Sequence, residues 1–307
     1  MKIIEQSYNN WPHCILMQND TIKLIITTDA GPRIVYFGPA NRDVNLFYQN
    51  KVHQGLSGGD EWRNYGGHRL WTSPQEGQRP NQADNDPVPY KISGNSVTLY
   101  CPIEAATLIQ KEITVTIDPD NPHVSVQHRI HNRGLWPITF ASWALTMMHE
   151  GGVEILPIPQ DRPRDYMPNY AICFWPWTKP NDKRFTLGGK YITLRHDGNN
   201  KEWFKIGFRN TEGWGAYLSQ GYMFVKVYKL DPGKEYPDYG STFETYTDSE
   251  FTEFETLGPL ETVNPGAYTG HTEDWHLISA VPVLDASVQI SEDEIESAIV
   301  PRIAKVL

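Results

Sequence analysis

The chain has 307 residues and a formal net charge of −10, and its composition excludes several classes of protein. The 10 Trp, 16 Tyr, 24 Gly and 23 Pro favour short strands joined by turns over long helices. The negative charge, with no run rich in Lys and Arg, argues against a nucleic-acid partner. No apolar stretch reaches the roughly eighteen residues of a membrane span, and no signal-peptide core is present, so we expect a soluble, cytoplasmic protein without membrane contact.

Alternating apolar and polar residues predict strands along most of the chain. The first run is 21–27, in which Ile22, Leu24 and Ile26 share one face. Other runs occupy residues 33–37, 96–100, 113–117, 123–130, 137–148, 191–195, 204–208, 222–230 and 251–257. No composition shift or repeat divides them. We therefore predict an all-β, large antiparallel β-sandwich that forms a single domain over residues 1–307.

The segment 57–89 is polar and rich in Gly, Pro, Gln and Asn, and we interpret it as a long functional loop. It contains Gly66-Gly67-His68-Arg69-Leu70-Trp71, in which paired glycines allow a ligand to approach the backbone. His68 and Arg69 would supply hydrogen-bond donors, and Trp71 an apolar face for sugar C–H groups. The alternative is a structural loop anchored by Trp71.

His149 follows the predicted strand 137–148 and precedes two glycines, so it should lie where the chain opens into a loop. The ordinary pKa of His suits a general acid near neutral pH. The alternative is a rim histidine whose ring is satisfied by backbone groups.

The predicted strand 251–257 carries two carboxylates on one face. Glu253 and Glu255 alternate with Thr252, Phe254 and Thr256, which places the two acids roughly 7 Å apart. In a concave site, burial and mutual repulsion could raise the pKa of one of them and make it a general base. The alternative is a solvated outer face with Phe254 in the core.

Other candidate sites are poorly supported. His128 and His131 should face opposite sides of a strand, and His271 with Glu273 is too small a ligand set, so we expect no metal. Ser57 lies in a Gly-x-Ser-x-Gly string that no helix follows, which argues against a nucleophile elbow. The three cysteines are widely spaced and are expected to be reduced.

One short helix is predicted at the C-terminus. Ser291 and Glu294 form a capping-box pattern, and Ile295, Ile299 and Ile303 recur every four residues. Pro301 should end or kink this helix, which we expect to cover one face or edge of a sheet.

Four segments in order resemble the galactose mutarotase-like superfamily, which includes the aldose 1-epimerases. They are AGPRIVYFG (30–38), VSVQHRIHNRGLWPITFASWALTMMH (124–149), TEFETLGPLETVNPG (252–266) and GHTEDWHL (270–277). The resemblance implies an antiparallel sandwich whose concave sheet binds a small-molecule sugar or oligosaccharide, with no cofactor.

The resemblance also implies roles for individual residues. Glu255 matches the general base and His149 the general acid of anomer interconversion, while His68, Arg69 and Arg33 match substrate-binding positions. We therefore expect an aldose or sugar-phosphate 1-epimerase. Two alternatives stay open: a non-catalytic carbohydrate-binding protein, and a lyase or hydrolase that uses Glu253 and Glu255.

Overall fold

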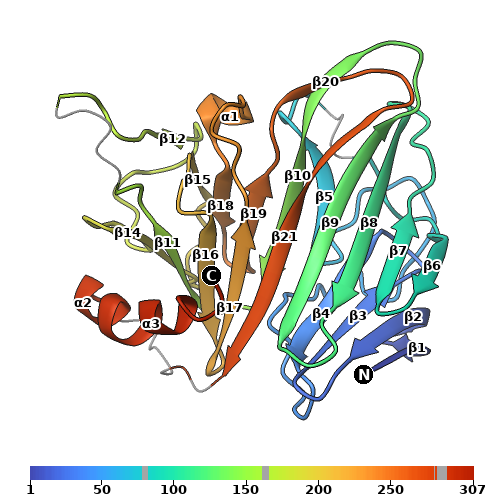
Figure 1. Ribbon diagram of the computed structural model, residues 1–307, viewed down its shortest axis with the longest axis horizontal. Coiled ribbons are helices and arrows are strands. Elements are labelled where there is room, and N and C mark those ends of the chain that lie inside the picture. Colours follow the sequence, from blue (N-terminus) through green and yellow to red (C-terminus); the bar gives the residue numbers. More distant parts are fainter. Residues whose placement is uncertain (78–81, 161–165, 280, 282–288) are drawn as a thin grey trace.

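The computed structural model describes residues 1–77, 82–160, 166–279, 281 and 289–307, and within them the chain forms two large antiparallel sheets (Figure 1). The first sheet has eleven strands in the order β1-β2-β3-β4-β5-β10-β19-β18-β15-β12, with β20 paired to β10. Its strands are β1 (Lys2–Tyr8), β2 (Trp11–Gln18), β3 (Ile22–Thr27), β4 (Arg33–Pro39), β5 (His68–Ser73), β10 (Ile138–Met148), β12 (Ile172–Phe174), β15 (Phe204–Phe208), β18 (Phe243–Thr247), β19 (Thr252–Leu257) and β20 (Glu261–Val263).

The second sheet has ten strands among the described residues, in the order β13-β14-β11-β16-β17-β21-β9-β8-β7-β6. They are β6 (Tyr90–Ser93), β7 (Ser96–Tyr100), β8 (Ile109–Ile117), β9 (His123–Asn132), β11 (Val153–Pro157), β13 (Phe185–Leu187), β14 (Tyr191–Arg195), β16 (Trp214–Ser219), β17 (Tyr222–Tyr228) and β21 (Tyr268–Ser279). The predicted antiparallel sandwich is thus confirmed.

The main hydrophobic core lies between the two sheets. Alternation sends Phe254 of β19 and Phe204 of β15 inward, where they join Phe224 and Trp275 from the second sheet, and all four are fully buried. Residues one position along each strand face the other way. In the first sheet this second face, which we call the outer face, carries most of the chemistry described below.

Three strands distant in sequence form the centre of the first sheet. β10 pairs with β5 on one side, where Leu145 lies opposite Arg69, and with β19 on the other, where Leu145 lies opposite Glu255. The interpretation of residues 57–89 as a single loop is therefore wrong at β5, which is a central strand with all six residues buried. This register places Arg69 and Glu255 on the same face of the sheet, with β10 between their two strands.

Part of the remaining segment 57–89 that the structure describes packs against the outer face near β4. Asp84 forms an ion pair with Arg33 of β4 at 2.8 Å, and the side-chain amide of Asn85 donates to the carbonyls of Gly59 and Glu61. The Tyr65 hydroxyl donates to Asn85. Specific polar contacts thus hold this part of the segment in place.

A helical segment near the C-terminus covers the second sheet on the side away from the first (Figure 1). It runs through α2 (Glu292–Glu294), the π-helical turn η1 (Ile295–Ile299) and α3 (Val300–Ile303), and begins with the predicted Ser291–Glu294 capping box. Ile295, Ile299 and Ile303 pack on β11, β16 and β17. Pro301 does not end the segment: a π turn directly precedes it, and helical structure continues to Ile303.

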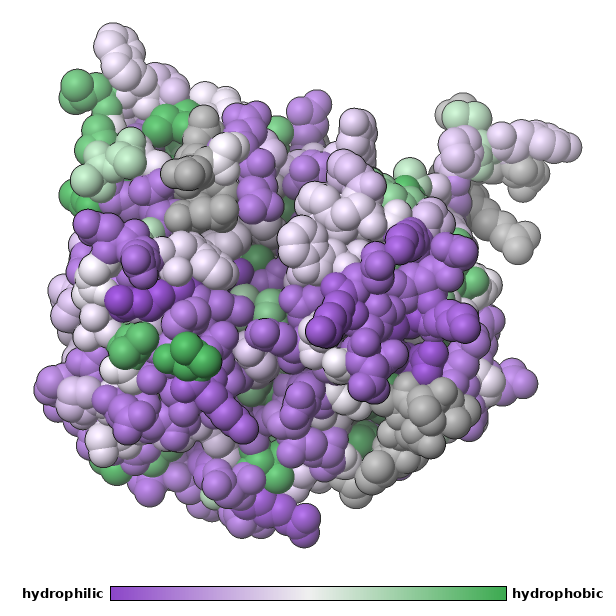
Figure 2. Space-filling view, turned by 180° about the vertical axis from the view of Figure 1, so that it is seen from behind, coloured by the Kyte–Doolittle hydropathy of each residue, from purple (hydrophilic) through white to green (hydrophobic). Residues whose placement is uncertain are grey.

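The face of the molecule seen in Figure 2 is mostly hydrophilic, and hydrophobic residues are scattered over it in small groups. The remaining helix, α1 (Pro237–Gly240), is a single turn before β18. None of the helices in the described part of the chain has the length and apolar character that a bilayer crossing requires.

Candidate functional site

A group of charged and aromatic side chains gathers on the outer face of five adjacent strands. We call it the outer-face cluster, and its members are Arg69 and Trp71 of β5, Trp143 of β10, Glu253 and Glu255 of β19, Glu244 of β18 and Lys205 of β15. Each is at most 8% exposed, so the alternative of a solvated face for Glu253 and Glu255 does not hold. Buried charges require partners, and the cluster supplies them internally.

Glu255 lies at the centre of the cluster. Its carboxylate accepts a hydrogen bond of 2.6 Å from the indole N–H of Trp143 and forms an ion pair of 2.9 Å with Lys205. The Lys205 ammonium also lies 4.5 Å from the centre of the Trp143 ring and 4.8 Å from that of Trp175. Glu255 is thereby fixed in position by a cation and an indole donor.

Lys205 links two carboxylates, since its ammonium also pairs with Glu244 at 2.8 Å. Burial acts to lower the pKa of Lys205, but the charges of Glu244, Glu255 and Glu253 outweigh it and raise that pKa above its ordinary value. Burial raises the pKa of Glu244 well above its ordinary value, against the opposing effect of Lys205. We therefore expect Lys205 to be charged at neutral pH.

Glu253 pairs with Arg69, whose guanidinium donates a hydrogen bond of 3.0 Å to it. Burial and the nearby charge of Glu255 raise the pKa of Glu253 to about 7, although Arg69 opposes them. The Arg69 guanidinium stacks 3.8 Å from the centre of the Trp71 ring, and burial lowers its pKa to about 10. Its Nε and Nη1 have no hydrogen-bond partner among the described residues, which leaves three N–H donors for a ligand.

The outer-face cluster has more acids than bases. Three carboxyl groups, those of Glu244, Glu253 and Glu255, face the two cations Arg69 and Lys205. In a buried site this excess favours retention of a proton near neutral pH. The cluster can therefore both accept and release a proton, which is the requirement for acid–base chemistry.

Arg33 also lies on the outer face, but it has separate partners. It donates to the backbone carbonyl of Gly66 at 3.1 Å and pairs with Asp84, and its guanidinium lies 5.1 Å from the Tyr65 ring centre. These contacts attach the segment 57–89 to β4 through Gly66 and Asp84.

His68 lies on the opposite face of β5 from Arg69, because successive strand residues point to opposite sides. It is buried between the sheets, where Nδ1 lies 2.8 Å from the Thr146 hydroxyl and Nε2 lies 2.8 Å from Nε2 of His128. The predicted binding pair of His68 and Arg69 is thus separated by a sheet. Burial holds the pKa of His68 well below its usual range.

An interior cluster surrounds His68. Glu273 of β21 pairs with Lys226 of β17 at 2.9 Å and accepts hydrogen bonds from Thr256 and from the Trp275 indole. The Lys226 ammonium also donates to Thr146 and to the Phe254 carbonyl, which belong to the other sheet. These contacts join the two sheets through polar groups.

Within the part of the chain that the structure describes, one group of side chains has metal-ligand spacing, namely His68, His128 and Glu273, whose ligand atoms lie within 4.8 Å of one another. The sequence analysis did not identify this group, since it considered His128 as a metal ligand only together with His131 of the same strand. A cation does not suit this position, because the Lys226 ammonium already neutralises Glu273 and the two His rings share a hydrogen bond. The group is satisfied as a hydrogen-bonded network.

The structure places His149 away from the outer-face cluster. It lies beyond the end of β10, four residues or about 13 Å along the chain from Leu145, the register partner of Glu255. Its Nδ1 lies 2.9 Å from the Glu150 carbonyl oxygen, and its own carbonyl accepts from Tyr217. It lines a pocket of about 590 Å³ together with Tyr48 and Glu250. These contacts fit the rim position that was the alternative for His149.

The sequence analysis missed three members of the outer-face cluster as site residues: Lys205, Glu244 and Trp143. Lys205 and Trp143 lie in strands that were predicted, but neither stood out by pattern. Only the order β10-β19-β18-β15 brings them to Glu255, and that order depends on pairing between distant segments.

Comparison with known proteins finds similar structures but no similar sequences. No protein-family model and no curated protein matches the sequence. A galactose mutarotase-like protein from Lactobacillus casei superposes with a TM-score of 0.57 at 12% identity, over 86% of this chain and 100% of the other. A galactose mutarotase-like protein from Clostridium acetobutylicum superposes with a TM-score of 0.54 at 9% identity, over 91% of this chain and 99% of the other. A TPR-domain containing protein from Parabacteroides distasonis gives 0.60 at 14% identity; the match covers 91% of this chain but 49% of that longer one. Identities this low support the fold alone, and the chain has the galactose mutarotase-like fold.

Proposed function

We propose that the outer-face cluster binds the ring of an aldose or aldose phosphate and interconverts its two anomers. The observation that carries this proposal is the pair of carboxyl groups on one face of β19, roughly 7 Å apart by strand geometry and flanked by Trp71 and Trp143. In this proposal the pyranose ring lies against this face, next to the two carboxyl groups. The indole rings offer apolar surfaces to its C–H groups, and Arg69 offers free donors to its hydroxyl oxygens.

Glu255 is the general base in this proposal, and Glu253 is the general acid. Glu255 takes the proton of the anomeric hydroxyl, Glu253 protonates the ring oxygen, and the C1–O5 bond breaks to give the open aldehyde. Rotation about C1–C2 and the reverse transfers then form the other anomer. A pKa of about 7 suits Glu253 to give and regain a proton at neutral pH. His149 has no role here, because its position along β10 is too remote from Glu255.

Polarimetry of freshly dissolved aldoses and aldose phosphates tests the proposal. We expect wild-type protein to accelerate anomeric equilibration and Glu255→Gln or Glu253→Gln to lower the rate constant by about 10²–10⁴-fold, the usual contribution of a positioned acid or base. His149→Gln is the matched control and should retain the wild-type rate.

Calorimetry with the same sugars separates catalysis from binding. Glutamine keeps the shape of the side chain, so sugar affinity should change only a few-fold in both Gln variants. Binding without any acceleration by wild-type protein would favour the non-catalytic carbohydrate-binding alternative. Full activity of Glu255→Gln would exclude Glu255 as the base.

A further inference from the structure

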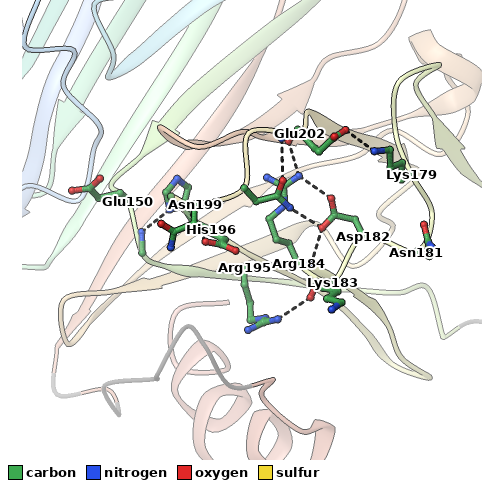
Figure 3. A pocket seen from close by; sticks show the side chains of 14 residues that line it. Glu150, Lys179, Asn181, Asp182, Lys183, Arg184, Arg195, His196, Asn199 and Glu202 are labelled. Atoms are coloured by element: carbon green, nitrogen blue, oxygen red, sulfur yellow. Dashed lines mark hydrogen bonds and ion pairs between the residues drawn. The ribbon is translucent and has the colours of Figure 1, made fainter.

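A second polar cavity lies outside the outer-face cluster, at the end of the second sheet. It has a volume of about 830 Å³ and is lined by residues 150–151, 179, 181–184, 195–200 and 202 (Figure 3). Pockets that bind small ligands fall in the same range of volume, about 300–1,000 Å³. Nothing in the proposed acid–base chemistry uses this cavity.

The charges that line the cavity balance. Four Lys or Arg side chains face four Asp or Glu side chains, and three Asn side chains add both donors and acceptors. Two of the acids are already paired, Asp182 with Arg184 at 2.8 Å and Glu202 with Lys179 at 2.8 Å (Figure 3). A phosphate or a carboxylate would meet no net attraction here. A neutral ligand with many hydroxyl groups matches the mixture of donors and acceptors.

His196 adds a buried donor to the cavity wall. Its Nδ1 accepts a hydrogen bond of 3.0 Å from the Gly151 N–H, so the neutral ring carries its hydrogen on Nε2 (Figure 3). Burial lowers the pKa of His196, which keeps the ring neutral at physiological pH. His196 is 4% exposed, and its Nε2 has no partner among the described residues. An oxygen acceptor would satisfy it.

Two exposed indole rings stand next to the cavity. Trp177 and Trp203 are 44% and 58% exposed and pack edge to face, with ring centres 6.2 Å apart. Each lies within two residues of a cavity-lining residue, and the Lys179–Glu202 ion pair joins the two segments. Exposed indole faces offer flat apolar surfaces against which the C–H groups of sugars can pack.

Residues 175–179, which include Trp177, also reach the outer-face cluster. The Trp175 ring lies 4.8 Å from the Lys205 ammonium, and the Thr178 hydroxyl bonds both the N–H and the carbonyl of Lys205. Residues 175–179 thus lead from the partner of Glu255 to the second cavity, over at most about 14 Å. Such a separation suits successive units of one sugar chain.

We propose that this cavity and the Trp177–Trp203 pair bind the distal units of a neutral oligosaccharide. The inference builds on the proposed function, since the reducing-end aldose of the same chain would occupy the outer-face cluster. The substrate class is then a neutral oligosaccharide in place of a free monosaccharide.

Calorimetry of the full chain with two neutral series, malto- and cello-oligosaccharides of one to five units, tests the inference. We expect affinity in one series to rise at least tenfold from the monosaccharide to the trisaccharide or tetrasaccharide. Trp177→Ala and Trp203→Ala should remove this gain while monosaccharide mutarotation stays at the wild-type rate. Trp136→Ala is the control, because Trp136 is 77% exposed on a different loop.

The outcomes separate the two proposals. Equal affinity for short and long sugars in wild-type protein, or a gain that survives both Trp changes, overturns the second site even if mutarotation is observed. Length-dependent binding lost in both Trp variants supports the site even if no mutarotation occurs, and then the proposed function fails alone. Tighter binding of oligogalacturonates of equal length would contradict the neutral class.

Discussion

The proton balance of the outer-face cluster depends on individual residues whose environments differ. Glu253 and Glu255 share a strand face, yet Glu253 is held by Arg69 and Glu255 by Lys205 and Trp143. Burial and the charge of Glu255 act on Glu253 and raise its pKa to about 7. Neighbouring carboxyl groups in unlike surroundings are a common source of an acid and a base in one site.

The rate of anomer interconversion should depend on the ionisation of Glu253. As a general acid it acts in the protonated form, which is lost as pH rises through about 7, so kcat should fall across that pH. Polarimetry between about pH 5.5 and 9, corrected for the uncatalysed rate, measures the profile. His149→Gln should keep the descending limb and Glu253→Gln should lack it. A limb that disappears with His149 instead would return the acid role to that residue.

At the level of elements, local pattern identified many of the strands but missed others, including β2 and β16. The predicted run 21–27 corresponds to β3, the run 123–130 to β9 and the run 251–257 to β19. β5 was missed because its residues His68, Arg69, Thr72 and Ser73 are polar yet buried on both faces, so no alternation marks them. Recognition of β5 as a strand would have separated His68 from Arg69 at once.

The composition of the site was only partly predictable from sequence. Glu253 and Glu255 could be placed on one face because they lie two apart in one strand. Lys205 could not be assigned to Glu255, since the two residues are 50 positions apart and meet through strand order. Strand order is set by pairing across the whole chain, and local pattern carries little information about it.

The C-terminal helical segment should contribute substantially to stability. Ile299 is fully buried against the second sheet, so Ile299→Ala should lower the free energy of unfolding by about 2–5 kcal/mol. Loss of the Ser291 cap in Ser291→Ala should cost about 1 kcal/mol. Equilibrium denaturation by urea measures both. Ser297→Ala, on the exposed side, is the control and should stay within about 0.5 kcal/mol; a similar small effect of Ile299→Ala would contradict the packing.

At the scale of the whole molecule, the two sheets are joined by polar as well as apolar contacts. Lys226 and Glu273 belong to the second sheet, and both are fully buried. Their bonds to Thr146, Thr256 and the Phe254 carbonyl cross to the first sheet. Such contacts favour one arrangement of the sheets, since a displacement would break the hydrogen bonds that these buried charged groups make to the first sheet.

Lys226→Met should therefore be strongly destabilising. It leaves the Glu273 carboxylate buried without its cation, and we expect a loss of about 3–5 kcal/mol in the free energy of unfolding. The double variant Lys226→Met with Glu273→Gln removes both charges and should recover part of that loss. A double-mutant cycle by chemical denaturation measures the coupling. Additive effects of the two changes would show that the pair does not act as a unit.

The strands at the ends of the two sheets bear on how the protein meets other chains. β12 and β13 have three residues each and β6 has four, while the longer β1 carries Lys2 and Glu5 on its exposed positions. Short or charged terminal strands offer little unpaired backbone to an extended peptide, and this discourages edge-to-edge aggregation. At three of the four sheet ends, a polypeptide that added itself as a further strand would pair with no more than four residues.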